Sequence, residues 1–394
     1  MFSAFNFRSY LLCGFVGLAL LVPPAGASAD QVKFLYKFQG GSDGAFPSNG
    51  LIMDKQGNFY GTTLAGGSEN CSYGCGTIFE LAANGTQKIL YYFQGGSDGS
   101  SPSGLLRDDK GNLYGTTSDG GASNYGTIFE LSPGGTKQIL YAFQDGADGA
   151  YPSSPLMRDK AGSLFGVAAG GGVSKEGTIF KLAREGSLSV LYSFCSKAGC
   201  ADGSTPQGAL LRDTAGNFYG TTYNGGTVGS GTVFKLSASG QESVLYSFCV
   251  QNYCPDGANP EFGVTMDPAG NLYGTTSAGG NFENNAFGVV FKVTPDGVES
   301  VLHNFTYFYD GARPLSGLLL DRGGYLYGTL EASQACHEKG TPVYRLAMDG
   351  TEKLYCVRNN KLFGNVIERN GYLYGVGGEG IFKENYGVVF AVKK

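Results

Sequence analysis

Short apolar stretches separated by polar turns fill most of the chain after residue 30. In a representative segment, runs rich in aromatic and β-branched residues occupy 104–108, 112–117, 126–131 and 137–143. Turns of Gly, Asn, Asp and Ser separate these runs, which is typical of β-strands. No 3.6-residue apolar period of the kind that marks an amphipathic helix competes with them. The pattern therefore predicts an all-β protein.

This four-strand pattern recurs along the chain. A Leu/Phe-Tyr/Phe-Gly tag places its glycine at 61, 115, 166, 220, 274, 328 and 375, with spacings of 47 to 54 residues. A period near 50 with several strands per unit is typical of propeller blades, whereas the coils of a β-helix are much shorter. We predict a seven-bladed β-propeller with four antiparallel strands per blade.

The ends of the chain indicate how the ring closes. An apolar run at 32–38 precedes the first unit as an additional fourth strand, and the last unit stops after its third strand, at 387–392. Pairing the N-terminal strand with the last blade completes the ring and covers two sheet edges. An open solenoid would instead need polar capping repeats. We expect residues 30–394 to form a single propeller domain.

The N-terminus has the features of a signal peptide. Arg8 precedes an apolar run over residues 10–22, and Ala27-x-Ala29 fits a signal-peptidase site. A run of about 13 residues is short for a membrane anchor, and no later segment approaches 18 apolar residues. We predict that residues 1–29 are removed and that the mature chain, beginning at Asp30, is secreted to the periplasm or the exterior as a monomer with no membrane span.

Composition narrows the function classes. The chain has 394 residues, 28 Lys and Arg against 33 Asp and Glu, and a formal charge of -5. Without a basic cluster, the counterion release that drives nucleic-acid binding has no source, so we expect no nucleic-acid partner. The two histidines, His303 and His337, cannot form a three-His zinc site and leave few candidates for a His-based triad. We predict no cofactor and no metal site.

Eight cysteines follow the predicted signal peptide, an even number that indicates disulfides in an exported chain. Cys195 with Cys200 and Cys249 with Cys254 occupy the same loop of neighbouring units, which favours local pairs. We expect Cys71 to pair with Cys75, which leaves Cys336 and Cys356. A zinc site at Cys71 and Cys75 would lack further nearby ligands. Eight cysteines nevertheless allow 105 pairings.

Two acidic positions recur. The first closes the inner hairpin as Asp-x-x-Gly-Asn or a looser copy, at Asp54, Asp108, Asp159, Asp213, Asp267, Asp321 and Glu368. The second is Asp-Gly-x-x-Pro, at Asp43, Asp98, Asp148, Asp202, Asp256 and Asp310. Because antiparallel strands alternate in direction, this second motif shares one face of the ring, here called the rim, with the loops between second and third strands. Calcium or sugar binding is one interpretation. The other, favoured here, is ordinary turn chemistry, because the Asp residues of neighbouring blades are too far apart to share an ion.

The candidate binding site consists of the rim residues that differ from one repeat unit to the next. The residue before each rim proline and the neighbouring loops supply aromatic, amide and arginine side chains suited to stacking and hydrogen bonding. The candidates are Phe46, Tyr73, Tyr125, Tyr151, Tyr223, Phe282, Arg313, Arg358, Asn359 and Tyr386. We expect a non-catalytic module that binds a glycan or an extracellular protein. The alternatives are a polysaccharide hydrolase or lyase with paired carboxylates at the channel mouth, and a purely structural surface protein.

A longer motif carries a family resemblance. The string Leu-Tyr-Gly-Thr-Thr-x-x-Gly-Gly, followed by Gly-Thr-Ile/Val-Phe-Glu/Lys-Leu, is cleanest at 113–131, 218–236 and 272–293 and degrades in the third, sixth and seventh units. It resembles the choice-of-anchor tandem-repeat GloVer family of secreted bacterial proteins over essentially all of the mature chain. The resemblance implies export and a repeat-built fold, and it carries over no catalytic residue.

Overall fold

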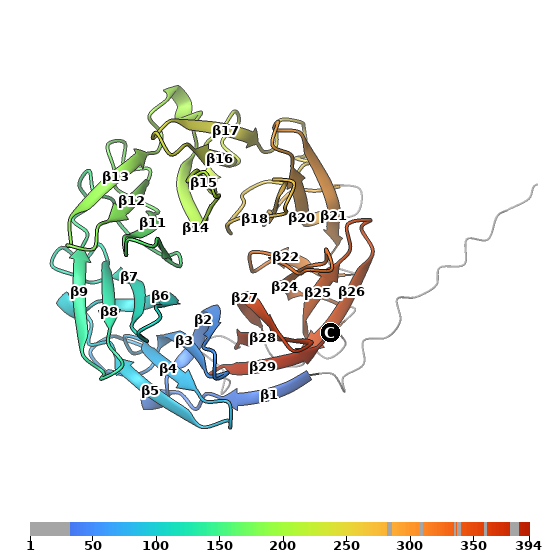
Figure 1. Cartoon of the computed structure of the whole chain (residues 1–394). Helices are drawn as coiled ribbons and strands as arrows, with labels where there is room; N and C mark the ends of the chain where they lie inside the picture. The colour runs from blue at the N-terminus through green and yellow to red at the C-terminus, as the bar shows by residue number, and fades with distance from the viewer. Residues whose placement is uncertain are drawn as a thin grey trace, which may run out of the picture.

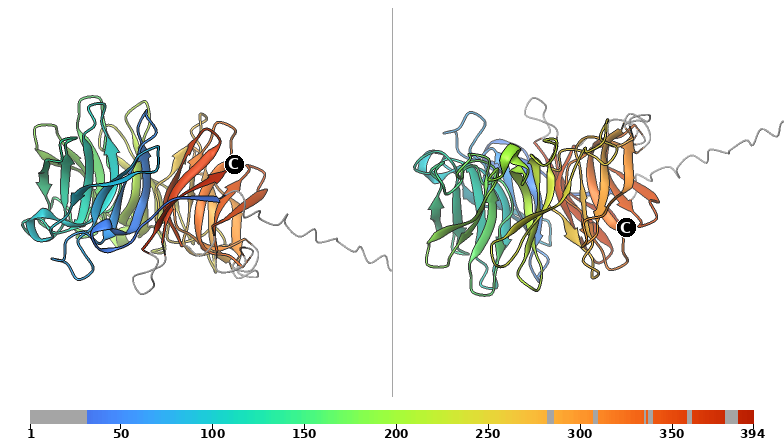
Figure 2. Two further views of the ribbon diagram at one scale, coloured as in Figure 1. Left: turned by 90° about the horizontal axis from the view of Figure 1, so that it is seen from below. Right: turned by 90° about the horizontal axis from the view of Figure 1, so that it is seen from above.

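The computed structural model shows seven sheets arranged in a ring around a central axis (Figure 1). It describes residues 32–281, 286–306, 310–334, 336, 340–357, 361–378 and 386–394. The predicted signal peptide, 1–29, and the candidates Phe282, Arg358 and Asn359 lie outside these residues. Seen from the side, the strands run between two loop-bearing faces (Figure 2). The prediction of seven four-stranded antiparallel blades is confirmed, with the inner position of the sixth blade divided into two short strands.

The strands follow the repeat. Blade 1 contains β2 (Ala45–Met53), β3 (Phe59–Ala65), β4 (Thr77–Leu81) and β5 (Gln87–Tyr92). Blade 2 contains β6 (Ser100–Arg107), β7 (Leu113–Asp119), β8 (Thr127–Leu131) and β9 (Lys137–Ala142). Blade 3 contains β10 (Met157–Arg158), β11 (Leu164–Ala168), β12 (Thr178–Leu182) and β13 (Leu188–Ser193). Blade 4 contains β14 (Ser204–Arg212), β15 (Phe218–Asn224), β16 (Thr232–Leu236) and β17 (Glu242–Ser247).

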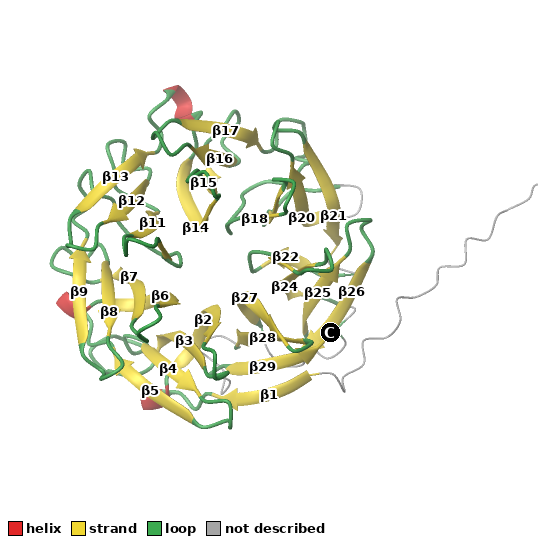
Figure 3. Cartoon of the chain, viewed as in Figure 1, coloured by secondary structure: helices red, strands yellow, loops and turns green. Residues whose placement is uncertain are grey.

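The second half of the ring is less regular. Blade 5 contains β18 (Thr265–Met266), β19 (Leu272–Thr275), β20 (Ala286–Val293) and β21 (Glu299–Thr306). Blade 6 contains β22 (Ala312–Pro314), β23 (Leu319–Leu320), β24 (Leu326–Ala332), β25 (Thr341–Leu346) and β26 (Glu352–Val357). Blade 7 contains β27 (Leu362–Arg369), β28 (Tyr372–Gly377), β29 (Val388–Lys393) and β1 (Val32–Lys37). Short 3-10 turns at η2 (Gly41–Asp43), η3 (Gly96–Asp98) and η4 (Ala198–Cys200) lie between blades (Figure 3).

The N-terminal strand closes the ring, as predicted. β1 pairs antiparallel with β29, for example Val32 with Val392 and Phe34 with Phe390. Phe38, the residue that follows β1, is 3% exposed and packs edge-on against Phe79 of blade 1, with ring centroids 5.1 Å apart. The N-terminal segment therefore joins blade 7 to blade 1 through both hydrogen bonds and apolar packing.

The core is distributed between blades. One buried cluster lies at each boundary; the cluster between blades 1 and 2, for example, joins Tyr60 and Ile78 to Leu113 and Phe129. A lone twisted blade has two apolar faces and cannot bury either, so each blade is stable only against its neighbours.

The tag glycines explain how closely the strands of a blade pack. A Cβ atom at Gly61 would lie 2.6 Å from the Phe79 ring of the paired strand. The same relation recurs at Gly115 with Phe129 and at Gly220 with Phe234. The repeated glycine therefore lets the aromatic ring of the paired strand pack directly against the backbone.

Candidate functional site

Both repeated acids have structural roles. Asp54 accepts hydrogen bonds from the Gly57 and Asn58 amides, at 2.9 Å each, which closes the inner hairpin. In the rim turn, Asp98 accepts from the Tyr91 hydroxyl at 2.8 Å and from the Gln94 amide at 2.8 Å. Burial and this hydrogen bond raise the pKa of Tyr91, so the hydroxyl stays a donor. Turn chemistry accounts for these carboxylates.

The rim candidates that precede the prolines share a rare backbone conformation. Non-glycine residues seldom adopt the left-handed region, which costs roughly 1–2 kcal/mol. Here it recurs at Phe46 (φ 57°), Ser101 (54°), Tyr151 (57°), Thr205 (54°), Asn259 (55°) and Arg313 (47°). At the first of these, the Phe46 amide donates to the Tyr386 carbonyl of the preceding blade at 2.8 Å. The most variable rim positions are thus held rigidly by neighbouring blades, which suits a preorganised binding face.

Three candidates border one groove. Phe46, Tyr73 and Tyr386 line a groove of about 440 Å³ between blades 7 and 1, together with Glu69 and the Cys71 end of a disulfide. The Tyr73 side chain is 57% exposed. A groove that presents aromatic rings beside polar loop groups can stack against a flat, partly apolar ligand.

The other described candidates fall into two further groups. The Tyr125 and Tyr151 rings meet edge-on, with centroids 5.6 Å apart. Tyr223 lies at the boundary of blades 4 and 5, where its carbonyl accepts a hydrogen bond from Asn259 Nδ2 at 3.1 Å. The Arg313 guanidinium donates a hydrogen bond to Glu261 Oε1 at 2.8 Å, and this interaction raises the pKa of Arg313. The candidates therefore surround the rim and do not converge on one point.

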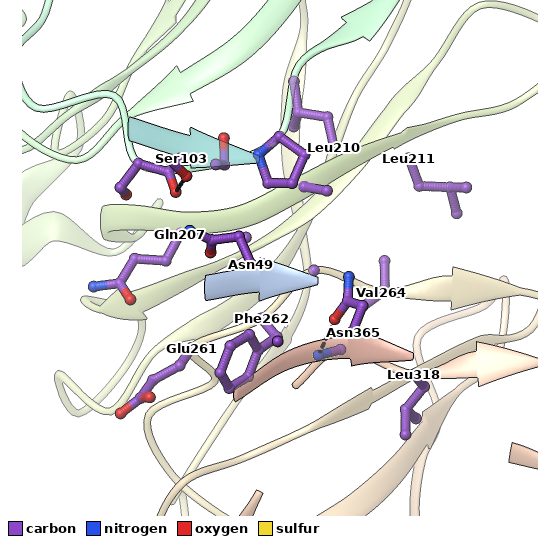
Figure 4. A pocket seen from close by; sticks show the side chains of 18 of the residues that line it. Asn49, Ser103, Gln207, Leu210, Leu211, Glu261, Phe262, Val264, Leu318 and Asn365 are labelled. Carbon is purple, nitrogen blue, oxygen red and sulfur yellow. Dashed lines mark hydrogen bonds between the residues drawn. The ribbon is translucent and has the colours of Figure 1, made fainter. Parts of the chain in front are cut away.

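The channel mouth holds a cavity that the sequence analysis did not single out. It has a volume of about 350 Å³, and Figure 4 shows side chains from several blades around it. Polar lining comes mainly from uncharged groups of the inner strands: Asn49, Ser101, Ser103, Ser154, Gln207 and Asn365. Phe262 adds an aromatic ring.

A signal for this cavity was present in the sequence. Asn49, Ser103 and Gln207 each stand immediately before a glycine of the inner strand. Those glycines allow neighbouring inner strands to touch: a Cβ atom at Gly50 would lie 2.6 Å from the Asn365 carbonyl. The residue before them varies at a fixed position, which is the criterion we applied to the rim loops.

The structure offers little for the enzymatic alternative at this mouth. Among the lining residues, Glu261 is the one carboxylate, and it pairs with Arg313. Carboxyl groups with raised pKa lie instead at the outer circumference: burial raises the pKa of Glu299 to about 7 and that of Glu352 to about 9. The general acid of a glycosidase needs such a group facing the substrate.

Disulfides reinforce the loops. Cys71–Cys75, Cys195–Cys200, Cys249–Cys254 and Cys336–Cys356 are paired, which confirms the local pairing expected from the repeat. Such bonds are typical of proteins that leave the cytoplasm. In the described part of the chain, no helix is long and apolar enough to cross a bilayer.

A match to a family model identifies the family to which the chain belongs. The model of the Gloeobacter/Verrucomicrobia repeat matches residues 68–265 and 250–394. The chain belongs to this repeat family. The match agrees with the family resemblance predicted from the repeated motif. A search of curated proteins finds no match.

Solved structures share the fold of this repeat protein at low identity. The extracellular domain of a one-component system from B. thetaiotaomicron is 12% identical with a TM-score of 0.58, covering 92% of this chain and 40% of that one. That of a hybrid two-component system from the same organism is 14% identical with a TM-score of 0.54, covering 89% and 39%. YCF48 from Cyanidioschyzon merolae is 10% identical with a TM-score of 0.56, covering 92% and 99%. The chain thus spans about 40% of the first two. These likenesses concern the propeller fold.

Proposed function

We propose that this repeat protein is exported and acts as a non-catalytic module that binds carbohydrate on its rim. The observation that carries the proposal is the combination, on one face, of a neutral hydrogen-bonding cavity with aromatic rings held around it. Sugars have flat apolar faces and many hydroxyls, so they are recognised by ring stacking together with amide and hydroxyl partners.

The charge of the cavity supports a neutral ligand. Its polar lining is dominated by serine, asparagine and glutamine, and Glu261 is already paired with Arg313. Side-chain amides both donate and accept hydrogen bonds, which matches a hydroxyl in either role. A volume of about 350 Å³ suits one or two sugar rings, and the aromatic groove near Tyr73 would extend the contact along a chain.

The test is a binding assay with the mature chain and a panel of bacterial and plant polysaccharides, scoring bound protein and released reducing ends together. We expect binding without release. Gln207→Ala in the cavity and Tyr73→Ala in the groove should each weaken binding about tenfold or more, because single central or aromatic anchors dominate affinity.

Phe34→Ala is the matched control, since this ring is 40% exposed but lies on β1 at the outer circumference. It should leave binding unchanged. Release of reducing ends would overturn the non-catalytic assignment. Absence of binding to every polysaccharide would refute the carbohydrate proposal and favour an extracellular protein partner.

A further inference from the structure

The boundary between blades 5 and 6 departs from the repeat. At the other rim turns a tyrosine hydroxyl of the outer strand bonds to the turn aspartate, as in Tyr36 with Asp43 (2.7 Å) and Tyr246 with Asp256 (2.8 Å). At the boundary of blades 5 and 6 a histidine replaces the tyrosine, and His303 Nε2 lies 2.7 Å from Asp310 Oδ2. One of the two histidines in the chain thus stands at a position where the repeat places tyrosine.

A second position that differs between blades lies beside this histidine and aspartate. Each rim turn is faced by the first residue of the outer strand of the blade that follows the turn. In blades 1 to 6 this residue is Gln87, Lys137, Leu188, Glu242, Glu299 and Glu352. At the boundary of blades 5 and 6 this residue is Glu352. Ligand atoms of His303, Asp310 and Glu352 all lie within 4.8 Å of one another. Nitrogen and carboxylate ligands from β21, the following turn and β26 therefore meet at one point.

The cluster is largely buried and has an unused ligand. The His303 and Asp310 side chains are 16% and 13% exposed. Glu352 Oε1 is inaccessible to solvent, and no described group forms a hydrogen bond with it. Thr306 donates to Asp310 Oδ1 from its amide at 2.6 Å and its hydroxyl at 2.9 Å. This fixes the aspartate and leaves Oδ2 directed toward the histidine.

At two other boundaries a lysine compensates the buried acid of the turn or of the outer strand. Lys137 pairs with Asp98 at 2.7 Å, and Lys197 pairs with Glu242 at 2.8 Å. Among the described residues, no lysine or arginine pairs with Asp310 or Glu352. Two carboxyl groups removed from water lie this close together only if one of them holds a proton or a cation compensates both. A divalent cation would supply that charge while using the free oxygen of Glu352.

We propose that His303, Asp310 and Glu352 bind a divalent transition-metal ion, for which zinc is the best match. Zinc accepts imidazole nitrogen and carboxylate oxygen at about 2.0–2.2 Å, with water as a fourth ligand. Ligand atoms around such an ion are about 3.4 Å apart, so the His303–Asp310 contact widens and Glu352 moves inward, each by roughly 1 Å. Calcium, which needs six to eight oxygens, fits poorly.

The ion would tie the outer strand of blade 5 to that of blade 6. None of the three ligands lines the rim cavity or the aromatic groove. The proposal is therefore independent of carbohydrate binding and assigns a structural metal at the outer circumference, where the ring has its least regular blades.

The test uses the mature chain, purified without a polyhistidine tag, treated with chelator and titrated with Zn²⁺ by calorimetry. We expect one ion per chain with micromolar or tighter affinity, and no competition from millimolar Ca²⁺. His303→Tyr and Glu352→Gln should each weaken binding by about 100-fold or more. Both variants restore residues that the blade 7 and 1 boundary already carries, Tyr36 and Gln87, so the fold accommodates them.

Two controls separate this site from adventitious binding. Glu299→Gln alters the neighbouring boundary, which has tyrosine instead of histidine, and His337→Gln removes the other histidine; neither should change the affinity. Zinc should also protect His303 of the unaltered protein from diethyl pyrocarbonate, measured by mass spectrometry without any variant. Undiminished binding in His303→Tyr, no binding to the unaltered protein, or unprotected His303 would overturn the proposal.

Discussion

Phe38→Ala tests how the N-terminal strand closes the ring. The ring of Phe38 is 3% exposed and contacts Phe79 and Tyr36, with centroids 5.1 and 5.2 Å away. Truncating a buried phenylalanine costs about 3–5 kcal/mol through lost transfer energy and the remaining cavity. For a chain of this length, that corresponds to a fall in melting temperature of roughly 4–7 °C.

Phe143→Ala is the matched control for this prediction. Phe143 follows β9 and contacts Phe180 and Tyr141 with centroids 5.3 Å apart in both cases, so its truncation should lower the melting temperature by a similar amount. The two variants should differ in local opening. Within the described residues, β1 is connected covalently to the ring at its C-terminal end alone, whereas β9 has strands before and after it in the chain.

Hydrogen–deuterium exchange distinguishes the two variants. Val388 to Val392 of β29 pair with β1, and their amides should exchange faster in Phe38→Ala than in Phe143→Ala because the unanchored strand detaches locally. A melting temperature within about 1 °C of the unaltered protein, or equal exchange in β29 of both variants, would refute the argument that Phe38 anchors the closing strand.

Two further predictions concern buried charge. Asp98→Asn should lower the free energy of unfolding, measured by urea denaturation, by about 3–4 kcal/mol, because it leaves Lys137, whose side chain is 3% exposed, without its carboxylate. Asp43→Asn removes the same turn bonds without a buried lysine and should lower the free energy of unfolding by about 1 kcal/mol. Equal losses in the two variants would contradict this account. Burial, reinforced by the charge of Asp256, raises the pKa of Glu299 to about 7, so the folded state binds the extra proton and stability from this group falls as pH rises from about 4.5 to 7. Glu299→Gln should then be nearly neutral at pH 4.5 and stabilising by about 1–2 kcal/mol at pH 8, after allowance for partial exposure; a pH-independent difference in unfolding free energy would disprove it.

Much of the scaffold follows from the sequence alone. The tag glycines and the additional fourth strand at 32–38 determine blade number, strand count and closure. The reason is that the apolar faces of a repeat unit can be buried only against neighbouring copies of that unit. Repeat phase also placed Cys195 beside Cys200 and Cys249 beside Cys254, since each pair occupies one loop. These inferences are local or periodic, and they need no knowledge of how distant residues meet.

The site depended on tertiary structure. Asn49, Gln207 and Asn365 come from three different inner strands, and only closure of the ring places them around one cavity. The prediction of no metal site rested on the number of histidines and on ligand spacings along the chain, and it remains a prediction until zinc binding is measured. His303 and Glu352 lie 49 positions apart but meet because the outer strands of neighbouring blades lie side by side. Composition and period determined the scaffold, whereas the groups that meet across blade boundaries were decided by the packing of one repeat against the next.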